Sequence, residues 1–175
     1  RQMVVMLARL SALVDGLDKG APDREARQTA DEIIHFFTET ARHHHEDEER
    51  HVFPQLQDSA DPDVIQAVLR LKQDHHWMDV DWRELSPLLA AIAAGQGGYD
   101  VGALREGVEI FTALSHDHIA LEESVVYPQA RANLPARERS AMADEMAARR
   151  RARQGGDEAR SSSHRPTSNG PSTTP

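Results

Sequence analysis

Apolar residues recur every three or four positions along four long stretches of the chain, the spacing that places them on one face of an α-helix. These stretches cover residues 3–17, 23–54, 62–94 and 101–128. The segments between them are short, so neighbouring helices are expected to run antiparallel. The pattern therefore predicts an all-α protein built as an antiparallel up-down four-helix bundle.

Residues typical of helix ends mark several of these boundaries. Gly20 and Pro22 follow the first stretch, and Asp61 stands where it can cap a helix that has Pro62 in its first turn. The segment 95–98, with three glycines, separates the third stretch from the fourth. These signals support the predicted division into four helices.

The chain is expected to consist of one domain and an extension. The bundle is assigned to residues 1–130 and a shorter C-terminal helical extension to residues 131–153. Residues 154–175 are mostly Ser, Gly, Pro, Thr and charged residues, which cannot bury enough apolar surface to fold, so a disordered tail is predicted there.

Several polar residues interrupt the apolar faces of the last three helices. His44 follows Ile33 by eleven residues and Phe37 by seven, so it continues the apolar stripe of the second helix. His75 lies within the stripe of the third helix. The predicted core-facing polar residues are His44, Glu48, His75, His118 and Glu122.

An eleven-residue phrase occurs twice, at residues 44–54 and 118–128. Without a gap, the two copies share a His, a Glu-Glu pair, a Val and a final Pro. On a helix, the His and the first Glu of each copy, four residues apart, project about 40° apart around the axis and roughly 6 Å apart along it. The final Pro is expected to stop each helix at the same distance from its His–Glu pair.

A metal centre is the chemistry that this arrangement favours. The chain has no cysteine, which excludes disulfide frameworks, thiolate metal sites and cysteine nucleophiles, so nitrogen and oxygen must hold any metal. A core-facing Glu is rarely buried unless it is paired or bound to a metal. The alternative is that the His–Glu pairs lie on the helix surface in a solvated charged run. His75 taken alone resembles an isolated core histidine that needs only a hydrogen-bond partner.

Other polar residues near these positions are expected to have outer or solvated roles. This group contains His43, His45, His51, His76 and His116. Asp79 follows His75 by four residues, so it is either an extra ligand or an acceptor for an imidazole N–H.

Charge and hydropathy limit the classes of partner. The net charge is −9, and the acidic excess lies in residues 1–130, which argues against nucleic acid as a partner. The basic run at residues 149–153 is interpreted as a solvated helix end. No run of 18 apolar residues is present, so we expect no membrane span and a cytoplasmic location. The sequence does not show whether the chain has a protein partner.

The doubled phrase resembles the signature of the hemerythrin-like (HHE cation-binding) family, and the resemblance covers about residues 1–130. It implies a centre of two iron ions bridged by an oxo group and carboxylates, with manganese as the alternative metal. Residue by residue, it implies that His44, His75 and His118 are nitrogen ligands. Glu48 and Glu122 would be the bridging carboxylates.

The chain departs from the family at one ligand. The histidine that the family carries on its first helix is absent from residues 1–30. Two explanations stay open: the histidine lies upstream of Arg1, or Leu7 has replaced it.

The resemblance leaves more than one function open. The first is reversible binding of O2 or NO for storage, delivery or sensing. The second is an enzyme acting on peroxide, O2 or NO, of a catalase-like or iron-centre repair type. In a third, regulatory role, a partner responds to whether metal is bound.

Overall fold

Helices make up the secondary structure of residues 2–18 and 20–133, the part of the chain that the computed structural model describes. The α-helices are α1 (Gln2–Gly16), α2 (Arg24–His35), α3 (Arg42–Asp47), α4 (Phe53–Gln57), α5 (Pro62–Ala93), α6 (Val101–Leu121) and α7 (Tyr127–Asn133). Three π-helical turns lie between helices that follow one another without a break. These are η1 (Phe36–Ala41) between α2 and α3, η2 (Glu48–Val52) between α3 and α4, and η3 (Glu122–Val126) between α6 and α7. No strand occurs among the described residues, which confirms the all-α prediction.

Aspartate side chains cap three of the long helices. The Asp23 carboxylate accepts a hydrogen bond of 2.8 Å from the backbone N–H of Ala26 at the start of α2. Asp61 caps α5 in the same way, as predicted, with Pro62 in the first turn. Asp100, which the sequence analysis did not identify, caps α6. These caps fix where each helix begins.

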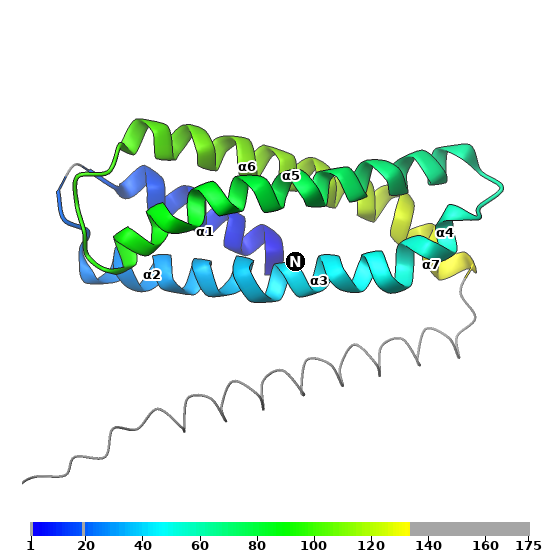
Figure 1. Cartoon of the computed structure of the whole chain (residues 1–175), viewed down its shortest axis with the longest axis horizontal. Helices are drawn as coiled ribbons and strands as arrows, with labels where there is room; N and C mark the ends of the chain where they lie inside the picture. Colours follow the sequence, from blue (N-terminus) through cyan, green and yellow to red (C-terminus); the bar gives the residue numbers. More distant parts are fainter. Residues whose placement is uncertain (1, 19, 134–175) are drawn as a thin grey trace, which may run out of the picture. The chain divides into compact units, whose positions relative to one another are not determined.

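The helices pack as an up-down bundle (Figure 1). α1 packs against α2 and α6, and α5 packs against the same two helices, so chain neighbours are also spatial neighbours. The core between them includes the fully buried side chains of Leu7, Leu10, Ile33, Leu89 and Ile92. α1 begins near the middle of the bundle, and α4 and α7 lie together at one end of it (Figure 1).

The prediction that Pro54 and Pro128 stop their helices is wrong. The chain stays helical through Pro54 to Gln57 and through Pro128 to Asn133. A proline normally breaks a helix because its ring collides with the carbonyl four residues earlier. Here a π turn precedes each proline, and the extra residue in that turn relieves the collision.

The chain divides by its internal contacts into one unit of Arg1–Asn133 and another of Leu134–Pro175. The helix and the tail predicted for residues 131–175, and the basic run at 149–153, fall almost wholly outside the described residues and stay predictions. Among the helices that are described, none has the length and apolar character to span a membrane.

Candidate metal centre

The two copies of the repeated phrase have the same local backbone. In each copy the π turn begins at the glutamate, with η2 starting at Glu48 and η3 at Glu122. The amide of Phe53 donates to the carbonyl of Glu48, and the amide of Tyr127 donates to that of Glu122. Single π turns within α-helices are frequent at functional sites. The proline that ends each phrase is the sequence signal that could have indicated these turns.

Four of the five predicted residues meet at one point in the bundle. Ligand-type atoms of Glu48, His75, His118 and Glu122 all lie within 4.8 Å of one another, and all four residues are buried. Nε2 of His118 lies 2.9 Å from Oε1 of Glu122, and Nε2 of His75 lies 3.5 Å from Oε2 of Glu48. The structure therefore brings together side chains from α5, α6 and both repeated phrases.

His44, the fifth predicted residue, lies at the edge of this group. Its side chain is 41% exposed, and its Nε2 atom lies 3.6 Å from Oε1 of Glu48. The same nitrogen lies 3.3 Å from the Tyr127 hydroxyl. His44 thus contacts one carboxylate of the group but does not converge on its centre.

The group fits a metal because its buried polar atoms lack partners. Seven such atoms find no hydrogen bond among the described residues: Nε2 of His45, Oε2 of Glu48, Oδ2 of Asp74, Nε2 of His75, Nδ1 and Nε2 of His118, and Oε1 of Glu122. Each unsatisfied buried group costs about 1–3 kcal/mol. Several at one point would consume much of the ~5–15 kcal/mol that stabilises a domain. A cation could bind one atom each of Glu48, His75, His118 and Glu122 and so satisfy four of them together.

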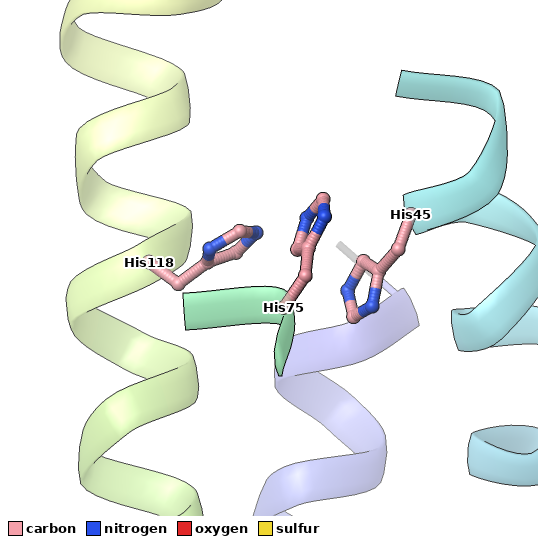
Figure 2. A group of neighbouring side chains, drawn as sticks. All are labelled: His45, His75 and His118. Carbon is pink, nitrogen blue, oxygen red and sulfur yellow. The ribbon is translucent and has the colours of Figure 1, made fainter. Parts of the chain in front are cut away.

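His45 was expected to be solvated or to have an outer role, but its ring lies against the centre. It stacks on His75 with ring centroids 4.1 Å apart and planes 17° apart. It meets the edge of His118 at 5.5 Å. Figure 2 shows the three rings side by side, with His75 between His118 and His45.

Three further residues that the sequence analysis did not single out hold the predicted ones in place. The Glu49 carboxylate accepts a hydrogen bond of 2.8 Å from Nδ1 of His75, and the Tyr127 hydroxyl donates to Oε1 of Glu48 at 2.6 Å. Asp74 lies 3.8 Å from Nδ1 of His118. Such outer contacts fix which imidazole nitrogen faces a metal.

Asp79, one of the expected candidates for that outer role, instead forms an ion pair with Arg83 on the same helix. Two of the histidines that were expected to have outer or solvated roles lie away from the four central side chains. His43 lies 3.8 Å from Glu39, and His76 is exposed.

Burial sets the protonation of the centre. It raises the pKa of Glu48 to about 8. Burial also raises the pKa of Glu122, but the adjacent His118 and Glu48 outweigh it and bring that pKa below its ordinary value. Burial lowers the pKa of His75, and burial with the neighbouring imidazoles lowers that of His45 well below the usual range. At neutral pH these imidazoles are therefore neutral, the form that binds metals.

A cavity of about 800 Å³ opens beside the histidines. His45 and His75 contribute to its wall together with aromatic side chains, which are Phe37, Trp82 and Phe111. Charged side chains, among them Arg42, Lys72 and Arg83, also line the cavity, so its wall is mixed. The cavity gives a small molecule an approach to the centre.

Two comparisons with known proteins agree with this geometry. The family model described as the hemerythrin HHE cation-binding domain matches residues 1–130. A protein of Haemophilus influenzae, described as uncharacterized, is 30% identical over 146 residues, which cover 83% of this chain and 82% of that protein.

Proposed function

Because this chain belongs to the hemerythrin HHE cation-binding family, we propose that it binds two iron ions and reversibly takes up O2 or NO. The observation that supports this proposal is the convergence of unpartnered nitrogen and oxygen atoms from four buried side chains. Mixed imidazole and carboxylate ligands suit iron, with manganese as the alternative.

Each predicted residue has a role in this proposal. Glu48 and Glu122, which start matching π turns, would supply the carboxylate ligands of the two metals. His75 and His118 are nitrogen ligands from the adjacent helices α5 and α6. His44 is a nitrogen ligand at the edge, and its 41% exposed side chain has room to turn toward Glu48, 3.6 Å away.

The residues around the centre orient it and control access. Glu49 holds Nδ1 of His75, which leaves Nε2 directed at Glu48. The cavity, whose wall includes Phe37, Trp82 and Phe111, has room for small molecules next to His45 and His75. When bound, iron supplies the redox capacity and the open coordination positions that O2 or NO requires.

The second candidate function is an enzyme that acts on peroxide, O2 or NO. The Tyr127 hydroxyl favours it, since it lies 2.6 Å from Glu48 and can donate a proton next to the centre. Turnover of peroxide would use such a donor, whereas reversible binding of O2 or NO would not.

The test is anaerobic reconstitution of the chain with ferrous iron, followed by exposure to O2 or NO. We expect two irons per chain and new visible absorption bands that disappear when the gas is removed. The variant Glu122→Ala should lose both the iron and the bands. Sustained O2 release from added peroxide would instead support the enzyme, and the absence of bound iron would overturn both functions.

A further inference from the structure

We propose that His45 is an additional nitrogen ligand of the metal centre, brought there by the π turn η1. The inference rests on the proposed function, since it concerns the ligand set of the same metal site. His45 does not belong to the repeated His–Glu pairs, and its side chain lies on the side of the centre that faces the cavity.

The helical phase explains why His45 faces inward. In a regular α-helix, a residue eleven positions after Ile33 returns to almost the same face, and that residue is His44. The structure instead has a buried stripe at Ile33, Phe37 and Ala41, each four residues apart, which His45 continues. In a regular helix, each step of four residues moves the side chain about 40° further around the helix axis.

The turn η1 covers Phe36–Ala41 and corrects this drift. Hydrogen bonds between residues five apart add one residue to the turn, so the inward face shifts by one position along the sequence. The position that a regular helix would give to His44 therefore passes to His45. The two neighbouring rings differ accordingly, because His44 is partly exposed and His45 is packed between helices.

The position of the His45 ring is that of a ligand. Its nitrogen belongs to a group in which ligand-type atoms of His45, His75 and His118 all lie within 4.8 Å of one another. Its Nε2 atom is buried and has no hydrogen-bond partner among the described residues. By contrast, Nε2 of His44 has the Tyr127 hydroxyl at 3.3 Å.

His75 and His118 belong to both metal-sized groups. One group adds the carboxylates Glu48 and Glu122, and the other adds His45. Because an imidazole nitrogen binds a single metal ion, His75 and His118 would serve one metal each, and His45 adds a third imidazole beside them.

The experiment measures metal binding by the full chain with Fe²⁺ and, as a spectroscopic probe, Co²⁺. The main variant is His45→Phe, which keeps an aromatic ring against His75 but removes the nitrogens. His45→Gln is the second variant, and His116→Gln, an exposed position on α6, is the matched control. Circular dichroism and urea unfolding of the metal-free proteins show whether each variant folds.

If His45 is a ligand, both His45 variants lose at least ~10-fold in affinity at one of the two metal positions. Their Co²⁺ absorption changes in wavelength and intensity, while His116→Gln matches the wild type. Two metals bound by His45→Phe with unchanged affinity and spectrum would overturn the assignment of His45 and leave the proposed function intact. A wild-type chain that binds no metal would overturn both.

Discussion

The hydroxyl of Tyr127 donates a hydrogen bond of 2.6 Å to Oε1 of Glu48. Tyr127 lies near the end of the second phrase and Glu48 in the middle of the first, so this contact joins the two copies across the bundle. Burial and the Glu48 carboxylate raise the pKa of Tyr127 above its ordinary value, which keeps the hydroxyl protonated as a donor. Phe53 occupies the matching position in the first phrase and has no such donor.

Removing this hydroxyl should destabilise the metal-free bundle. Tyr127→Phe leaves a buried oxygen of Glu48 without its donor, so we expect a loss of about 1–3 kcal/mol in the free energy of unfolding. Urea denaturation measures it. The control is Tyr99→Phe, since the buried Tyr99 hydroxyl has no partner among the described residues and its loss should cost little. Equal effects of the two variants would contradict the role of the Tyr127 hydroxyl.

The stability of the metal-free protein should fall with rising pH because of Glu48. Its folded-state pKa of about 8 lies above the ordinary value of 4.5. Between these values the native state binds more protons than the unfolded state, so the free energy of unfolding decreases as pH rises toward about 8. Above that window no further loss is expected from this group.

Glu48→Gln removes this ionisable group and keeps a side chain of nearly the same size. The variant should gain stability relative to the wild type as pH rises from 5 to 8.5, as measured by urea unfolding without metal. A constant difference between the two proteins across that range would show that Glu48 ionises normally.

Metal binding should release protons and strengthen with pH. Glu48 holds its proton up to about pH 8 in the metal-free site, and a metal must displace it. For one displaced proton, we expect the affinity to rise by roughly tenfold per pH unit below that value. Calorimetry in buffers of different ionisation enthalpy counts the protons. An affinity independent of pH between 6 and 8 would count against a protonated Glu48.

Glu49 should influence metal affinity through His75 without being a ligand. Glu49→Gln weakens the 2.8 Å contact that orients Nδ1 of His75, so we expect a loss of about 10-fold in metal affinity. The side chain is 47% exposed, so the free energy of unfolding should change little. Glu123→Gln, the counterpart in the second phrase, is the control and should bind metal like the wild type. The same loss in both variants would indicate a general effect of charge.

Local signals in the sequence were sufficient for the helices and for most of the candidate site. Asp61 and Pro62 marked a helix start because capping depends on neighbouring residues only. Glu48, His118 and Glu122 were identified from the repeated phrase, and His75 from its place on an apolar helix face. Their meeting within 4.8 Å follows once the helices pack as a bundle.

The choice between His44 and His45 was made by the tertiary structure. A helix gains one residue at a π turn only where packing on both sides favours the wider turn, and the apolar pattern carries no separate signal for it. That single residue rotates the following side chains by about 100°. The same kind of turn let the chain continue as helix through Pro54 and Pro128, where local rules predicted an end. The sequence by itself determined which residue types meet in the core, and packing decided that the His45 ring stacks on His75 while His44 stays at the edge.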